Sequence, residues 1–227
     1  MTRLRIATYN IHGCVGIDGR RDVDRVVSVL SELDVAAVGL QEVDSRRQPD
    51  PPSGQMVTLA RGLGMTAVPG HTILQPTGTY GNALLTGLPV AKVNRYDLSV
   101  SRREPRGAVA VTLLTRSGPV DMVVTHLGLA RSERFQQLER LDAIASRATG
   151  PLVVMGDFNE WTRWRLRRMR FAAHGGRSPR TYPSWLPILA LDRVFTRPAA
   201  VLESIECHTP ARRGASDHLP LVATIAL

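Results

Sequence analysis

The chain alternates short apolar runs with polar positions, and this pattern predicts the strands of an α/β protein. Residues 4–8 alternate between apolar and polar, whereas residues 35–40 form a continuous apolar run that is typical of a strand buried on both faces. Further strands are expected at 71–74, 83–86, 91–98, 108–115, 120–125, 152–155, 191–195, 201–207 and 219–227.

Apolar residues at helical spacing predict three helices between these strands, at 23–33, 56–63 and 131–147. Asp22 is placed to cap the first helix, and Gly64 is placed to end the second. Phe135 is expected on the apolar face of the third helix. Helices of this length need a buried face, so each should pack against a sheet.

The order of elements is strand, helix, strand, helix, a run of strands, helix and strands again. This departs from the strict alternation of a doubly wound parallel sheet. We therefore predict an α/β fold of the α+β type, with two mixed or mostly antiparallel sheets packed together and helices outside. The richest Pro/Gly stretch, at 48–54, is short and indicates a surface loop. Residues 1–227 are therefore expected to form a single domain.

The composition is that of a globular protein with a basic excess. The chain has 227 residues and a formal net charge of +9, and Lys92 is its only lysine, so the cations are almost all arginines. Genome composition and attraction to a phosphate-bearing partner both explain such a bias. The two cysteines exclude a disulfide scaffold and favour a reducing compartment. Without an apolar run of membrane-spanning length or a secretory signal, we expect a monomeric cytoplasmic protein.

Polar side chains cluster where the predicted strands stop or begin. A single Asn or Asp after a strand is most often a turn former, so only the joint pattern predicts a site. Proteins place binding residues in loops held at strand ends by a rigid scaffold. The residues in this pattern are Asn10, Glu42, His126, Asp157, Asn159, Asp192, Asp217 and His218.

The chemistry of this set favours a hard cation and phosphoryl transfer. Carboxylate and amide oxygens suit Mg²⁺ or Mn²⁺, and the lack of a Cys/His cluster argues against structural zinc. Mg²⁺ takes one or two protein carboxylates and leaves other positions to water and phosphate oxygens. An aspartate can fix an imidazole and hold it protonated, and Asp192 with His218 is the natural pair.

Seven motifs resemble those of the endonuclease/exonuclease/phosphatase superfamily, in that family's order and over nearly the whole chain. They are TYNIHG (8–13), LQEVD (40–44), YGNALLT (80–86), VTHLG (124–128), GDFNE (156–160), LDRVF (191–195) and SDHLPL (216–221). QEVD alone is a weak signal, but the seven together are strong. The resemblance implies a four-layer α/β sandwich and a divalent-metal-dependent hydrolase of phosphoester bonds.

The resemblance also implies roles for residues at the matching positions. Glu42 would be the principal metal ligand, with Asn10 close to the same ion and Asp217 a ligand of this or a second ion. Asp157 would orient or deprotonate the attacking water. Asn159 would hold a phosphate oxygen.

The remaining matching positions are implied to act on the phosphate and its leaving group. His218, held by Asp192, would stabilise the pentacovalent transition state or protonate the leaving group. His126 would lie near the phosphate. Tyr80 and Asn82 would shape the site, and Arg106 would reach a substrate phosphate or be an ordinary surface arginine. His12 is expected to pack rather than to line the site.

The segment WTRWRLRRMR at 161–170 follows GDFNE directly and contains five arginines and two tryptophans. On a helix, Trp161, Trp164 and Arg168 would share one face. Large aromatic residues are usually well buried, so we expect the tryptophans in the core. The arginines are expected to face an anion, because no carboxylate follows in the sequence until Asp192.

Three substrate classes remain open at this point: nucleic acid, lipid headgroups and small phosphorylated molecules. The charge and the arginines rank a phosphodiesterase of nucleic acid slightly above one acting on anionic lipid headgroups, as sphingomyelinases do. A phosphomonoesterase acting on an inositol or another small phosphate would use the same site. A non-catalytic anion-binding module is a remote alternative, because none of the candidate catalytic residues has been replaced.

Overall fold

Two β-sheets form the centre of the computed structural model, which describes residues 2–46, 54–172, 178–211 and 214–227. The surface loop expected at 48–54 therefore lies, except for Gly54, outside the described residues. The first sheet contains β1 (Arg3–Asn10), β2 (Ala37–Asp44), β3 (Thr66–Gln75), β4 (Gly78–Thr86), β10 (Leu202–Cys207) and β11 (Leu221–Ala226). The second contains β5 (Val90–Asp97), β6 (Gly107–Thr115), β7 (Gly118–His126), β8 (Leu152–Asp157) and β9 (Asp192–Arg197).

Both sheets are mixed, as the order of elements predicts. The strand order is β10-β11-β1-β2-β4-β3 in the first sheet and β5-β6-β7-β8-β9 in the second. The pairs β1–β2 and β7–β8 are parallel, and the other pairs are antiparallel. Each sheet thus has two adjacent strands that end on the same side, which brings polar residues after different strands together.

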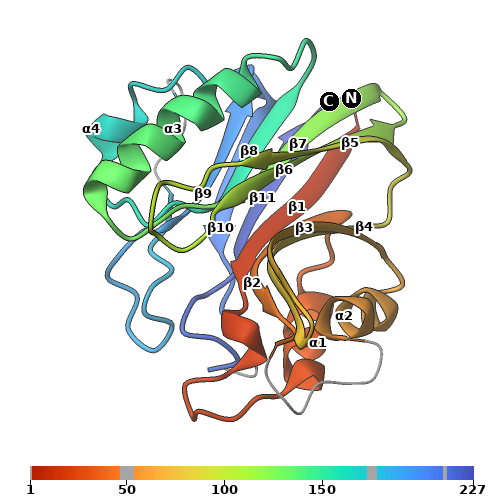
Figure 1. The fold of residues 1–227 in the computed structure, drawn as a ribbon. Helices are drawn as coiled ribbons and strands as arrows, with labels where there is room; N and C mark the ends of the chain where they lie inside the picture. Colours follow the sequence, from red (N-terminus) through yellow and green to blue (C-terminus); the bar gives the residue numbers. More distant parts are fainter. Residues whose placement is uncertain (1, 47–53, 173–177, 212–213) are drawn as a thin grey trace.

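Helices cover the outer faces of both sheets, which gives the four layers (Figure 1). On the first sheet lie α1 (Val23–Glu32) and α2 (Gln55–Leu63), and on the second lie α3 (Arg131–Ala145) and α4 (Arg163–Leu166). The Asp22 side chain accepts a hydrogen bond from the Arg25 amide at the start of α1, and Gly64 ends α2 in the left-handed conformation. Two 3₁₀ turns, η1 (His12–Cys14) and η2 (Ala199–Val201), complete the described elements.

Three apolar clusters match the three spaces between these layers. One joins side chains of both sheets, including Ile6, Leu84 and Met122. A second joins the first sheet to α1 and α2, and a third joins the second sheet to α3 and α4. The four-layer sandwich is therefore confirmed. No helix among the described residues has both the length and the apolar character needed to cross a membrane.

The close approach of β7 and β8 explains the glycine in GDFNE. Gly156 has a φ of 148°, and a Cβ there would lie 1.9 Å from the Thr125 carbonyl oxygen. Only glycine fits this position without moving a strand. The close pairing sets Asp157 directly beside His126 at the ends of the two strands.

The segment at 161–170 differs from the expectation. Its helix, α4, has only four residues, too few to present a continuous face. Leu166 is buried, whereas Trp161 and Trp164 are 57% and 54% exposed, so their predicted place in the core is wrong. Phe135 on α3 is also 57% exposed, because the helix buries Leu138 and Leu141 against the sheet instead.

The arginines of this segment are also less free than the sequence indicates. Arg165 forms an ion pair with Glu160, the last residue of the GDFNE motif. Arg170 forms another with Asp142 on α3. Both acidic partners precede the segment in the sequence. Glu160 stands directly before it, and Asp142 comes from another helix.

Candidate active site

Side chains from the ends of both sheets line one cavity of about 470 Å³. Asn10 ends β1, His126 ends β7 and Asp157 ends β8, while Asp192 begins β9 opposite Asp157. The predicted residues that line the cavity are Glu42, Tyr80, Arg106, His126, Asp157, Asn159, Asp217 and His218. The other three, Asn10, Asn82 and Asp192, are at most 2% exposed and lie in or behind its wall.

A β-bulge in β2 positions Glu42. Gln41 and Glu42 together stand opposite the single residue Asn82, because the pairing of β2 with β4 shifts at this point. Glu42 has a φ of 57°, which is uncommon for a residue with a side chain. The bulge changes the backbone direction at Glu42, whose side chain lines the cavity, while the preceding Gln41 is buried.

Asn10 connects the two sheets through its side-chain amide. Its Nδ2 donates to Glu42 Oε1 at 3.0 Å and to Asp157 Oδ2 at 3.1 Å. Its Oδ1 accepts from the His12 amide at 3.1 Å. One neutral side chain therefore holds two carboxylates, from different sheets, at the same point of the cavity.

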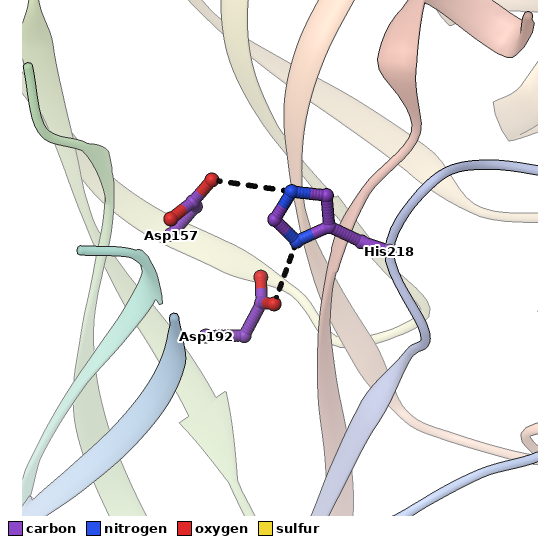
Figure 2. Close-up of side chains that lie close together, drawn as sticks. All are labelled: Asp157, Asp192 and His218. Carbon is purple, nitrogen blue, oxygen red and sulfur yellow. Dashed lines mark hydrogen bonds and ion pairs between the residues drawn. The ribbon is translucent and has the colours of Figure 1, made fainter. Parts of the chain in front are cut away.

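His218 is held between two aspartates (Figure 2). Its Nδ1 lies 2.8 Å from Asp192 Oδ2, and its Nε2 lies 3.7 Å from Asp157 Oδ2. Thr181 Oγ1 donates to the same Asp192 oxygen at 2.5 Å. Burial alone would lower the pKa of His218, but the charges of Asp192 and Asp157 outweigh it and raise the pKa to about 10. The imidazole is therefore a cation at neutral pH.

His126 is the opposite case, a buried imidazole that stays neutral. Burial is the main cause that lowers its pKa to about 3, and the Arg106 charge adds to this, while the charge of Asp157 opposes it. Asn159 Nδ2 donates to the Leu127 carbonyl at 2.9 Å and also lies 3.2 Å from His126 Nε2. The backbone N–H of Asn159 donates to Asp157 Oδ1 at 2.8 Å. His218 and His126 thus differ in charge although they line the same cavity.

Comparison with known proteins agrees with this geometry. Residues 7–218 match the sequence model of the Endonuclease/Exonuclease/phosphatase family. The chain belongs to this family. The family hydrolyses phosphoester bonds, and the chain is a phosphoester hydrolase.

The relatives of this family member span almost its whole length. The uncharacterized protein YbhP of Escherichia coli K12 is 26% identical over 243 residues, which covers 98% of this chain and 96% of YbhP. An endonuclease/exonuclease/phosphatase from Beutenbergia cavernae has a TM-score of 0.81 at 21% identity, covering all of this chain and 72% of that one. The mannosyl-6-phosphatase Bt3783 of Bacteroides thetaiotaomicron has a TM-score of 0.77 at 15% identity, covering 99% and 100%. At these identities the solved structures show the shared fold alone.

The donor set beside Glu42 fits the divalent cation that the family uses. Three carboxylates, of Glu42, Asp157 and Asp217, line the same cavity. Burial raises the pKa of Glu42, and the charges of Asp157 and Asp217 raise it further, whereas the Asn10 hydrogen bond and His12 lower it. A cation would relieve this repulsion, and oxygen ligands of this kind suit Mg²⁺ or Mn²⁺.

The group in the described residues whose three ligand atoms all lie within 4.8 Å of one another is a different one: Asp157, Asp192 and His218. Protonation argues against it as the cation site. A metal needs a lone pair on the imidazole, but His218 uses Nδ1 to bind Asp192 and is protonated at neutral pH. The residues beside Glu42 therefore suit a divalent cation better than the group that contains Asp192.

Several residues of the site lay outside the sequence predictions. Thr181 and Tyr182 belong to no motif, yet Thr181 binds Asp192 and the Tyr182 ring lies 4.9 Å from the His218 ring. Ser216, from the SDHLPL motif, donates to the Asn10 carbonyl at 2.7 Å. His12 was expected to pack, but it is partly exposed and lines the cavity, with Nδ1 3.8 Å from Asp217 Oδ1. A motif position could have indicated Ser216, whereas only the fold brings Thr181 and Tyr182 to the site.

Proposed function

We propose that the chain is a divalent-metal-dependent phosphodiesterase that acts by in-line attack of water on phosphorus. The observation that supports this most directly is the contact chain from Glu42 through Asn10 and Asp157 to His218. It brings together, at one cavity, a carboxylate to bind the metal, a carboxylate to orient the attacking water, and a protonated imidazole. These are the parts that phosphoester hydrolysis requires.

In this proposal Glu42, Asn10 and Asp217 hold the cation. When bound, Mg²⁺ or Mn²⁺ supplies charge neutralisation at the phosphate. Asp157 orients the attacking water and takes its proton. Its carboxylate is fixed for this role, because the Asn10 side chain donates to one oxygen and the backbone N–H of Asn159 donates to the other.

His218 stabilises the negative charge that develops on the pentacovalent phosphorus or on the leaving oxygen. Asp192 keeps the imidazole charged and oriented, so Asp192 is a positioning residue. Nε2 of the imidazolium is the group that faces the cavity. It can donate its proton to the leaving group and recover it from solvent.

Neutral donors hold the phosphate oxygens on the other side of the cavity. Nε2 of His126 and Nδ2 of Asn159 lie 3.2 Å apart, and both residues line the cavity. Arg106 supports His126 and lines the cavity, and Tyr80 lines it beside Arg106. Asn82 donates to the Gly107 carbonyl at 3.0 Å, so we assign it a shaping role.

The charge balance of the cavity favours a diester over a monoester. The two arginines described in its lining are both paired, Arg46 with Asp44 and Arg106 with Glu104. A diester carries one negative charge, whereas a monoester carries close to two at neutral pH. Among several carboxylates, the singly charged substrate meets less repulsion.

A substrate panel with product analysis tests this proposal. Plasmid, abasic duplex, single-stranded DNA, sphingomyelin, phosphatidylinositol phosphates and a chromogenic phosphodiester are each incubated in Mg²⁺, in Mn²⁺ and in EDTA. Cleavage of a diester without release of inorganic phosphate, lost in EDTA, is the expected result. Release of inorganic phosphate from monoesters alone would favour the phosphomonoesterase. No turnover of any diester with either ion would contradict the proposal.

A further inference from the structure

Exposed large apolar side chains concentrate on one side of the cavity mouth. Seven of the eleven found in the described residues lie in three short segments, 129–135, 161–164 and 185–188. The other four lie singly in other parts of the fold. We call the seven the apolar rim; they are Leu129, Phe135, Trp161, Trp164, Trp185, Leu186 and Ile188.

The apolar rim is continuous with the candidate active site. Leu129 and Trp161 line the cavity itself. The loop at residues 182–189, which precedes β9 and is drawn in light blue in Figure 1, is closed at its base by backbone hydrogen bonds between Tyr182 and Leu189, which also line the cavity. The tip of this loop holds Trp185, 70% exposed, with Leu186 and Ile188.

Hydrogen bonds fix this loop to the segment that carries Asp217 and His218. The Ser184 amide donates to the Asp217 carbonyl at 2.7 Å, and Ser184 Oγ donates to the Ser216 carbonyl at 2.7 Å. The exposed tip therefore has a defined position beside the mouth of the cavity.

The other half of the apolar rim borders a groove between α3 and α4 of about 670 Å³. Phe135, Trp164 and Met169 line it, with arginines among them. The guanidinium carbons of Arg165 and Arg168 lie 5.1 and 5.5 Å from the centre of a Trp164 ring. The groove therefore combines apolar surface with cationic groups.

A buried carboxylate keeps this half of the apolar rim in place. Glu160 is 2% exposed and forms ion pairs with Arg134 of α3 and Arg165 of α4. Arg134 also donates to the carbonyl oxygens of Gly128 and Leu129. These ion pairs and hydrogen bonds therefore hold the backbone beside Trp161 and Leu129 in place while the two side chains remain exposed.

The sequence that carries the second and third segments of the apolar rim is rich in arginine. From Trp161 to Leu191 the chain has seven arginines and no acidic residue, and all three of its tryptophans lie there. An anionic partner with an apolar interior matches both properties. Nucleic acid matches only one, because Leu129, Leu186 and Ile188 have no ring on which a base could stack.

We propose that the apolar rim docks this protein on an anionic lipid bilayer, with the mouth of the cavity facing the lipid headgroups. Tryptophans and arginines would lie at the headgroup level, and the aliphatic tip would enter the acyl region. This inference deepens the proposed function, on which it rests for the reaction catalysed at the membrane.

Vesicle flotation in EDTA tests the docking without turnover. Wild type is compared with Trp185→Ser/Leu186→Ser/Ile188→Ser, none of which lines the catalytic cavity. The matched control is Val57→Ser/Leu114→Ser, which removes exposed apolar side chains from α2 and from β6. Vesicles contain phosphatidylglycerol with phosphatidylcholine, or phosphatidylcholine alone.

Wild type and control should float with the anionic vesicles, and the triple variant should lose about tenfold or more of this partitioning. Wild type that stays unbound, or a triple variant that binds as wild type does, would overturn the proposal. Binding of a single-stranded oligonucleotide is measured in parallel. If the triple variant loses this binding and keeps vesicle binding, nucleic acid is the partner and the proposal is wrong.

Two further measurements keep the result interpretable. Turnover of a soluble chromogenic phosphodiester should be unchanged in the triple variant; absence of turnover in wild type would contradict the proposed function while leaving the flotation result valid. If the triple variant does not fold, Phe135→Ser/Trp164→Ser removes the groove half of the apolar rim and must lower partitioning in the same direction. Unchanged partitioning of that variant would likewise overturn the docking.

Discussion

Arg106 donates a hydrogen bond from Nη1 to Nδ1 of His126 across 3.1 Å. A guanidinium cannot accept a hydrogen bond, so Nδ1 must be the acceptor. Because His126 is neutral, its one proton then lies on Nε2, where Asp157 Oδ2 at 3.5 Å is the acceptor, and Asn159 Nδ2, 3.2 Å from the same nitrogen, donates to the Leu127 carbonyl instead of to the ring. The arginine therefore fixes His126 as a donor toward the place where we put the phosphate.

Replacing this arginine should disturb both the tautomer and the rate. We expect Arg106→Ala to lower kcat/KM by about 10–100-fold, the usual cost of removing a residue that orients a site histidine. Nitrogen NMR of the imidazoles should show the Nε2–H form of His126 in wild type and a mixture in the variant. The exposed Arg102→Ala is the control. A variant with an unchanged tautomer and rate would remove Arg106 from this role.

The pair of Asp192 and His218 predicts a defined pH dependence. The negative charge of Asp192 helps to raise the pKa of His218 to about 10, so activity should fall as pH rises through that region. Asp192→Asn removes this charge, the pKa of His218 falls, and the basic limb of kcat/KM moves to lower pH. We also expect kcat to fall by about 10²–10⁴-fold. A basic limb that stays in place would contradict the role given to Asp192.

His126 should make the metal-free protein sensitive to acid. Its folded-state pKa of about 3 lies below the ordinary value of 6.5, so only the unfolded chain takes up a proton between these values. The contribution of His126 to the free energy of unfolding is therefore fully present above about pH 6.5. It falls as pH drops, by at most about 1.4 kcal/mol per pH unit. In urea unfolding with EDTA, His126→Gln should lose less stability than wild type between neutral pH and pH about 5. Parallel losses would indicate that His126 is not buried neutral.

Metal affinity should separate the two candidate cation sites. Calorimetric titration with Mn²⁺ should show binding to wild type that Glu42→Gln weakens by about 100-fold, because a charged ligand is lost. Asp192→Asn should change the affinity by only about threefold or less, because Asp192 binds His218 instead. The reverse order would place the ion among Asp157, Asp192 and His218.

The sequence was sufficient to predict the layers of the fold and the polar residues that stand at the strand ends. Asn10 and Asp157 end strands of the two parallel pairs, and His218 joins them because it precedes β11, which runs antiparallel to β1 and begins beside the end of β1. The bulge that turns Glu42 toward the cavity could not be predicted, because it depends on how β2 pairs with β4. Periodicity identifies such a strand but not an extra residue within it.

The errors at 131–170 also have a physical cause. The prediction for Trp161 and Trp164 rested on the usual burial of large aromatic residues, whereas α4 has four residues and buries Leu166 instead. Glu160 binds Arg165 and Arg134, although the sequence offered it only as the end of a motif. Tertiary packing, which no local pattern records, decides which aromatic side chains remain exposed.

The central claim is that this cavity hydrolyses a phosphodiester with a cation held by Glu42. The most direct test is the rate of hydrolysis of bis(4-nitrophenyl) phosphate by wild type and Glu42→Gln, with equal melting temperatures confirming that both are folded. We predict turnover by wild type that EDTA abolishes and Mg²⁺ restores, and a loss of about a thousandfold or more in Glu42→Gln. Equal rates for the two proteins, or wild-type turnover that persists in EDTA, would contradict the account.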